Sequence, residues 1–148
     1  MLIELSDKKY SKYFITVPAM EKLAFSAAAN QKVLGKTDTR VYMSEELVKG
    51  SDTHIVHIGI IDMPSTNPFT EDHVHPFNAI MMFVGLDMND PEDLGGELEY
   101  ILGEEEELHR TDKSSAIFLP AGFKHNVRFL RVDRPFLLIA VNLSGAYG

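Results

Sequence analysis

The chain contains no cysteine among its 148 residues. Without cysteine it can form no disulfide scaffold, thiolate zinc site or iron–sulfur cluster, and it has no cysteine nucleophile. A cysteine-free chain also fits a reducing compartment, so we expect a cytoplasmic protein. At this length the core can be large enough to do without disulfides, and one domain is expected.

Long apolar runs and clustered basic residues are missing as well. No run approaches the ~20 apolar residues that span a bilayer, and "MLIELSDKKYSKYFITV" at the N-terminus lacks the apolar core of a signal peptide. The 14 basic residues are scattered among 22 acidic ones, giving a net charge of −8. Surfaces that bind nucleic acid need clustered lysine and arginine. We therefore expect neither a membrane nor a nucleic-acid partner.

The N-terminal part is predicted to contain one helix. In "PAMEKLAFSAAANQKVLG" (residues 18–35), Pro18 suits the first helical position and Gly35 suits the stop. A short edge strand is predicted just before the helix, over residues 13–17. We therefore divide the chain into an N-terminal extension with a helix, residues 1–38, and a β domain, residues 39–148.

From Thr39 onward the pattern changes to strands. Runs rich in β-branched and aromatic residues alternate with Pro, Asn and Gly clusters, as in an antiparallel sandwich or barrel. The acidic run "EEEE" (104–107) is predicted to be a solvated hairpin turn, and residues 64–69 and 87–96 are predicted to be loops. The predicted strands cover residues 39–43, 53–63, 79–86, 97–103, 114–122, 125–132 and 135–143.

Three histidines are candidate metal ligands. His73 and His75, in "EDHVHPFNAIMMFVG", are two residues apart, so on a strand both would point to the same face and could reach one metal ion. His125 follows a Pro-x-Gly turn in "FLPAGFKHNV", where a new strand begins. A histidine placed by a turn in this way could complete a site shared by two sheet segments.

An HxH motif before an apolar strand, followed later by P-x-G-x-x-H, resembles the cupin superfamily over roughly residues 53–143. The resemblance implies a double-stranded β-helix, which is a small jelly-roll barrel. It also implies a divalent transition metal (Fe, Zn, Mn or Ni) held by His73, His75 and His125. Small cupins further imply a homodimer built through edge strands.

The sequence departs from the cupin pattern at one ligand. A glutamate is expected three or four residues after the second histidine, but Ala79 and Ile80 stand there, and the preceding Asn78 offers only a neutral oxygen. Glu97 and Glu99 share one face of a predicted strand. If that face is inward, either could replace the ligand, with Glu97 slightly favoured; if Leu98 and its neighbours face inward, both glutamates are solvated and water fills the place.

The resemblance implies two functions of different class. One is a metal-dependent enzyme acting on a small carbonyl or hydroxy compound, with Glu97 or a bound water moving protons. The other is a non-catalytic cupin that binds or senses a small molecule. In either case we expect residues 79–86 and Phe118 to line the ligand pocket. His54, His57 and His109 are predicted to be surface or core histidines.

Overall fold

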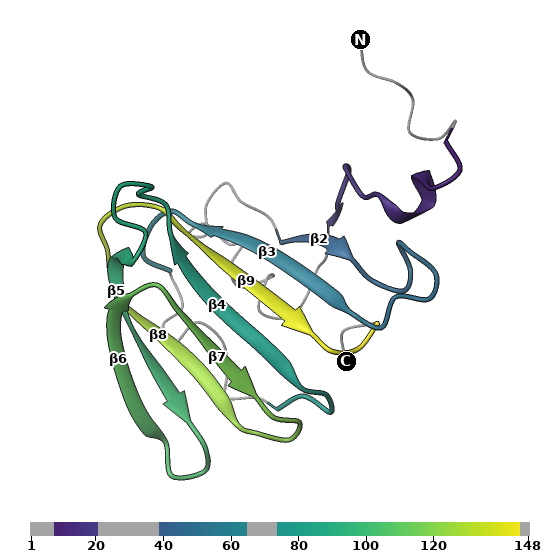
Figure 1. Cartoon of the computed structure of the whole chain (residues 1–148). Coiled ribbons are helices and arrows are strands. Elements are labelled where there is room, and N and C mark those ends of the chain that lie inside the picture. Colours follow the sequence, from purple (N-terminus) through teal and green to yellow (C-terminus); the bar gives the residue numbers. More distant parts are fainter. Residues whose placement is uncertain (1–7, 21–38, 65–73, 146–148) are drawn as a thin grey trace.

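The computed structural model describes residues 8–20, 39–64 and 74–145 (Figure 1). Strands dominate these residues, and no helix among them is long and apolar enough to cross a membrane. A short 3-10 helix, η2 (Ser11–Tyr13), precedes the first strand. The strands are β1 (Ala19–Met20), β2 (Arg40–Met43), β3 (His54–Ile60), β4 (Ala79–Gly85), β5 (Asp93–Leu102), β6 (Glu107–Lys113), β7 (Ser115–Leu119), β8 (His125–Val132) and β9 (Phe136–Asn142).

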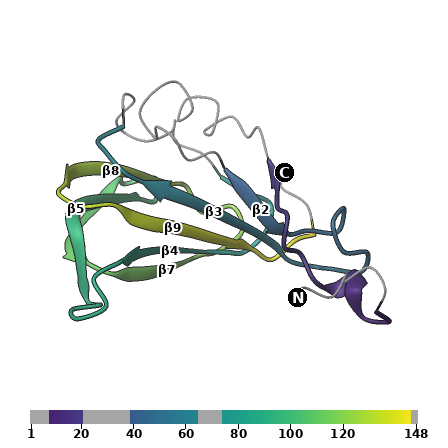
Figure 2. The same cartoon turned by 90° about the horizontal axis from the view of Figure 1, so that it is seen from above.

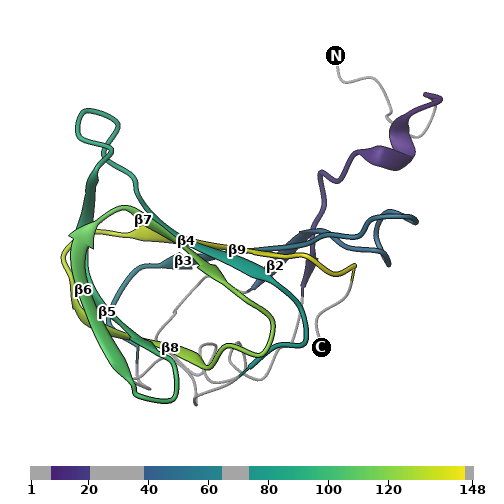
Figure 3. The ribbon, with the colours of Figure 1, turned by 60° about the horizontal axis from the view of Figure 1, so that its bottom comes forward.

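The strands form two antiparallel sheets that face each other. The larger sheet has the order β1-β2-β3-β9-β4-β7, and the smaller one has the order β6-β5-β8. Figures 2 and 3 show the two sheets curving toward each other, with β5 and β8 opposite β3, β9 and β4. Strands that are distant in sequence lie side by side, as β3 and β9 do, so the chain crosses repeatedly between the sheets. This is the double-stranded β-helix predicted from the sequence.

The core lies between the sheets and comes from alternate residues of each strand. Inward positions of β3, β4, β5, β8 and β9 carry large apolar side chains, three of which are phenylalanines packed edge-on or tilted against one another. This alternation follows from the two-residue period of a strand, which sends every second side chain to the same face. The buried cluster consists of Val56, Ile58, Ile60, Phe83, Leu94, Leu98, Tyr100, Val127, Phe129, Phe136 and Leu138.

Several predicted elements differ from the observed ones. β5 begins at Asp93, inside the predicted loop 87–96. Its register against β6 shifts between Asp93 and Leu98, and this irregular stretch of the strand accommodates Gly95 and Gly96. β6, which follows the predicted acidic turn, was not predicted as a separate strand. The turn predicted over residues 104–107 is observed at residues 103–106, and Glu107 is the first residue of β6.

The strand and the start of the helix predicted near the N-terminus are not found where they were expected. Residues 13–17 form no strand; the edge strand lies at Ala19–Met20 and pairs with Arg40 and Val41 of β2. Ala19 and Met20 were predicted to be helical, but they form a strand because they pair with the edge of β2. The rest of the predicted helix, residues 21–35, lies outside the described residues.

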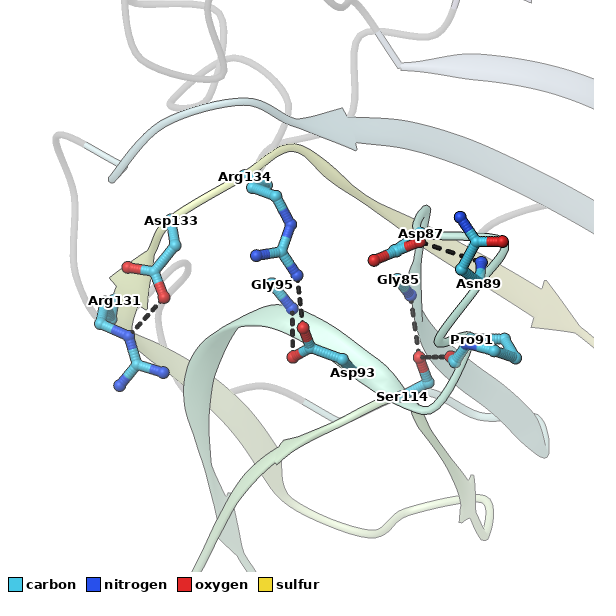
Figure 4. A network of polar contacts seen from close by, with 10 residues as sticks. All are labelled: Gly85, Asp87, Asn89, Pro91, Asp93, Gly95, Ser114, Arg131, Asp133 and Arg134. Atoms are coloured by element: carbon cyan, nitrogen blue, oxygen red, sulfur yellow. Dashed lines mark hydrogen bonds and ion pairs between the residues drawn. The ribbon is translucent and has the colours of Figure 1, made fainter.

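One end of the barrel is fastened by polar contacts around the β4–β5 loop (Figure 4). The Ser114 hydroxyl accepts a hydrogen bond from the Gly85 amide (2.9 Å) and donates one to the Pro91 carbonyl (2.8 Å). Asp93 accepts a hydrogen bond from Arg134, which precedes β9. These contacts join the C-terminal end of β4 to the N-terminal ends of β5, β7 and β9. Of the histidines predicted to bind a metal, His75 and His125 belong to the opposite end, where β4 and β8 begin.

Candidate metal centre

The candidate site lies where β4 and β8 begin and where β5, β7 and β9 end. Two backbone hydrogen bonds hold the segment before β4 against the rest of this end: Gly122 N–H donates to the His75 carbonyl (2.8 Å), and Leu143 N–H donates to the Asn78 carbonyl (2.9 Å). Gly122 has a φ of 78°, a left-handed conformation that glycine adopts without steric cost. The Pro-x-Gly turn therefore lies against His75, and His125, which follows the turn, lies beside His75.

The imidazoles of His75 and His125 are close neighbours. Their ring centroids are 5.2 Å apart and the rings are tilted by 45°. With metal–nitrogen bonds of about 2 Å, two imidazoles on one ion have centroids roughly 4.5–5.3 Å apart. The observed separation therefore fits two histidines that share an ion. His75 is also stacked on Phe77, with ring centroids 5.0 Å apart, which restricts the orientation of its ring.

His125 has the hydrogen bonding of a metal ligand. Its Nδ1 lies 2.9 Å from the Phe123 carbonyl oxygen, and its side chain is buried. A carbonyl oxygen can only accept, so Nδ1 carries the proton and Nε2 carries the lone pair of the neutral ring. Metal-binding histidines commonly have their second nitrogen fixed in this way. The donor set therefore suits a divalent transition metal.

The third predicted histidine, His73, lies outside the described residues. Among the residues that the structure describes, no group of three histidine, aspartate or glutamate side chains could hold a metal. The structure thus brings together two of the predicted ligands and leaves the others to be considered one by one.

A row of four paired residues crosses the larger sheet at this end. Ala79 of β4 is paired with Leu119 of β7 on one side and with Asn142 of β9 on the other, and Asn142 is paired with His54 of β3. All four side chains are buried. Asn142 Nδ2 lies 3.0 Å from His54 Nδ1. A polar pair therefore lies in the same row as Ala79.

Comparisons with known proteins give matches among solved structures only. No family model matches the chain, and no curated protein sequence matches it. A protein with a double-stranded β-helix domain from Klebsiella pneumoniae has a TM-score of 0.51 and 16% identity, over 88% of this chain and 95% of that one. The chain has the double-stranded β-helix fold.

Two longer proteins share this fold over part of their length. The DMSP lyase DddQ from Ruegeria pomeroyi matches with a TM-score of 0.51 and 18% identity, over 84% of this chain and 55% of its own. An iron(II) form of HppE matches with a TM-score of 0.50 and 12% identity, over 72% of this chain and 49% of its own. The chain therefore spans about half the length of these two proteins.

Asn78, the neutral substitute for the missing cupin glutamate, has another role. Its side-chain oxygen accepts a hydrogen bond from the Ala121 amide (2.8 Å), and its backbone carbonyl accepts the one from Leu143. Asn78 therefore fixes the Pro-x-Gly turn against the start of β4. It positions the segment carrying His75 rather than offering an oxygen to an ion.

Glu97 is not brought to the histidines. It is paired with Arg131 in the β5–β8 ladder, whereas His125 is paired with Leu102 at the other end of the same ladder. The adjacent Leu98 belongs to the core, so Glu97 points to the outer face, where its carboxylate lies 3.9 Å from the Arg131 guanidinium. The sequence left open whether the glutamate face or the leucine face of this strand is inward, and in the structure the leucine face is inward.

Glu99 shares this outer face but is buried, with its side chain only 2% exposed. Its carboxylate accepts a hydrogen bond from Arg110 Nε on β6 (2.8 Å) and lies 3.5 Å from Arg128 on β8. The carboxylate also raises the pKa of the Arg110 guanidinium, mainly through this hydrogen bond. Glu99 is therefore a link between three strands and not a replacement ligand.

The predicted pocket walls are partly wrong. Met81 and Phe83 of β4 face the interior and contact the core. Phe118 is 55% exposed, because its neighbours Ile117 and Leu119 take the inward positions of β7. Met81 packs against Ala79 and Leu119 at the site end, whereas Phe83 lies deeper in the core and Phe118 lies on the outer surface.

Of the remaining histidines, His54 is the most informative. His57 faces the outer side of the larger sheet beside Tyr42, and His109 is exposed and contacts Glu107. His54 is buried and paired with Asn142, a residue that sequence reasoning did not single out. A lone asparagine at an inward position of the apolar run "FLLIAVN" was the available signal.

Proposed function

We propose that the chain binds one divalent transition metal (Fe, Zn, Mn or Ni) through His73, His75 and His125. We further propose that it acts on a small organic compound with a carbonyl or hydroxy group at this end of the barrel. The observation that carries the proposal is the His75–His125 pair, with His125 Nδ1 held by the Phe123 carbonyl. The iron(II) bound by HppE, which has the same fold, is consistent with it.

The residues around the pair have distinct tasks in this proposal. A bound metal would supply Lewis-acid polarisation of the ligand's oxygen. Phe123 fixes the proton of His125 on Nδ1, so that Nε2 offers its lone pair. Phe77 stacks on His75 and holds its ring in place. Met81 and Leu119 provide apolar walls that exclude water from the inner side.

The His54–Asn142 pair would give the site a neutral polar wall. Asn142 Nδ2 donates to His54 Nδ1, so the His54 proton is on Nε2. This pair lies in the row of Ala79, the position of the cupin glutamate. Hydrogen bonds from such a pair can orient a ligand without introducing a charge.

A second candidate function, binding or sensing without catalysis, is supported by a specific feature. Ala79 is buried where the cupin pattern has glutamate, and neither Glu97 nor Glu99 lies at this end of the barrel. The chain then has no carboxylate of its own, among the described residues of the site, to move a proton. Catalysis would require a bound water to do so.

Metal titration of single-alanine variants tests the metal site. By isothermal titration calorimetry with Mn²⁺, Ni²⁺ and Zn²⁺, we expect the wild type to bind about one ion per chain. His73→Ala, His75→Ala and His125→Ala should each weaken binding more than about 100-fold, since loss of a ligand costs more than loss of its outer partner. His109→Ala, an exposed histidine on β6, is the matched control and should bind like the wild type.

The two functions are separated by assays of the metal-loaded protein. A panel of small hydroxy acids and carbonyl compounds is followed by calorimetry for binding and by mass spectrometry for conversion. Conversion that His125→Ala abolishes supports the enzyme. Saturable binding of a compound that is recovered unchanged supports the sensing protein. Wild-type protein that takes up none of the three metals would contradict the metal site common to both.

A further inference from the structure

Three neighbouring strands of the larger sheet are apolar on both faces. The inner face forms the core, but the outer face is equally apolar and is covered by no described element (Figure 3). Each of its apolar side chains is partly exposed. We call this surface the outer face; it consists of Ile55 on β3, Ile80, Met82 and Val84 on β4, and Leu137, Ile139 and Val141 on β9.

The two sheets of the same chain differ in this respect. On the smaller sheet the outward positions carry charged and polar residues, such as Glu99, Arg110 and Arg128, while inward ones are apolar. An antiparallel sheet with one solvated face shows this alternation, whereas strands buried on both sides read as continuous apolar runs. "AIMMFVG" and "FLLIAVN" are such runs. The larger sheet therefore has the composition of a sheet covered on both sides.

The outer face extends to both neighbouring strands. Phe118 on β7 is 55% exposed, and Tyr42 on β2 is 36% exposed. β3, β4 and β9 have seven residues each and are roughly 23 Å long, whereas β2 has four and β7 has five. At a spacing of about 4.8 Å the five strands cover on the order of 480 Å² in projection. An apolar patch of this size is in the upper part of the range of about 300–600 Å² for the largest patch on a monomer, and it amounts to more than half of the ~800 Å² that each partner buries in a stable interface.

The charge distribution favours a second copy of the chain as the occupant. The chain carries a net charge of −8, so two copies repel unless they meet where acidic residues are missing. No outward position of β3, β4 or β9 carries an aspartate or glutamate, and His57 is the one ionisable residue there. A twofold axis through the centre of this face would place apolar side chains of one copy on those of the other.

We propose that the outer face packs face to face on the same face of a second copy, forming a homodimer. The two larger sheets would then stack at about 10 Å, as in a β-sandwich. This differs from the edge-strand dimer that the sequence resemblance implied. It is also independent of the metal proposal, because none of these side chains faces the barrel interior.

Sedimentation velocity and light scattering of the full chain between about 1 and 100 μM test the proposal. We expect the wild type to have twice the 16.6 kDa mass of one chain. Met82 and Ile139 are directly paired at the centre of the outer face. Met82→Lys should therefore yield a monomer, and the milder Ile139→Thr, which keeps β-branching, should raise the dimer dissociation constant at least tenfold.

Leu108→Lys is the matched control, since Leu108 is an exposed leucine on β6 of the smaller sheet. It should remain dimeric, and so should His125→Ala. Circular dichroism confirms that each variant is folded before its mass is interpreted. A wild type that is monomeric at 100 μM, or a dimer that tolerates both Met82→Lys and Ile139→Thr, would overturn the proposal.

Discussion

At the scale of single residues, Asp93 makes the stability of the fold depend on pH. Arg134 donates a hydrogen bond to its carboxylate, and this contact, together with the Gly95 N–H, holds the pKa of Asp93 below its ordinary value of 3.8. A carboxyl whose pKa is lowered by folding stabilises the protein above its unfolded pKa. That contribution disappears as the pH falls through the folded pKa.

Asp93→Asn should therefore lower the melting temperature at pH 7 by a small amount, on the order of 2 °C or less, because the pair is exposed to solvent. The difference from the wild type should shrink as the pH falls below about 4, where the wild-type carboxyl also becomes neutral. Differential scanning calorimetry from pH 7 to pH 2 measures this. Arg134→Gln should give the same pH profile, and adding it to Asp93→Asn should change little; additive losses would show that the two side chains do not act as a pair.

Residues also mark where sequence reasoning reaches its limit. His75 and His125 could be paired from the sequence, because an HxH motif and a Pro-x-Gly turn indicate their positions on adjoining segments. Glu97 could not be placed, since strict alternation predicts that Glu97 and Glu99 share a face but not which face is inward. The deciding fact is tertiary: Leu98 packs in the core, while Arg110 and Arg128 on two other strands compensate the charge of Glu99.

At the scale of elements, the crossing between β4 and β5 depends on a glycine. A Cβ on Gly85, the last residue of β4, would lie 1.9 Å from the Asp93 carbonyl oxygen, which is backbone and cannot move aside cheaply. Gly85→Ala should therefore cost about 3 kcal/mol of unfolding free energy or more, measured by urea denaturation.

Gly122→Ala provides the comparison for this prediction. A Cβ on Gly122 would meet open space, so only its positive φ is penalised, at about 1–2 kcal/mol. If Gly122→Ala destabilised the protein more than Gly85→Ala, the close approach of β4 and β5 could not be the reason for the glycine.

Elements were predictable where the sequence repeats with a two-residue period or forms an apolar run. β8 has the bounds predicted for it, and β4 and β9 lie within their predicted runs. The start of β5 was missed because Gly95 and Gly96 indicate a loop when read alone. They are accommodated in a strand because Gly96 packs directly on the Arg131 carbonyl of β8, where a Cβ would come within 2.4 Å. That neighbour is 35 positions away, so no local pattern reveals it.

At the scale of the whole molecule, the proposed metal would add a side-chain link between the two sheets beside the backbone hydrogen bond from Gly122 to His75. His75 precedes β4 in the larger sheet, and His125 begins β8 in the smaller one. An ion bound to both bridges the two sheets at the end opposite the Ser114 and Asp93 contacts. Because the unfolded chain cannot hold these histidines together, a bound metal must stabilise the fold.

We therefore expect metal to raise the melting temperature of the whole domain. At a free concentration 100 times the dissociation constant, an ion that binds only the folded chain adds about 2.7 kcal/mol, or roughly 5–10 °C for a domain of this size. Scanning calorimetry with and without Ni²⁺ or Zn²⁺, and again after adding EDTA, measures the shift. His125→Ala should abolish it and His109→Ala should preserve it, whereas an equal rise in both variants would show that the stabilising ion binds elsewhere.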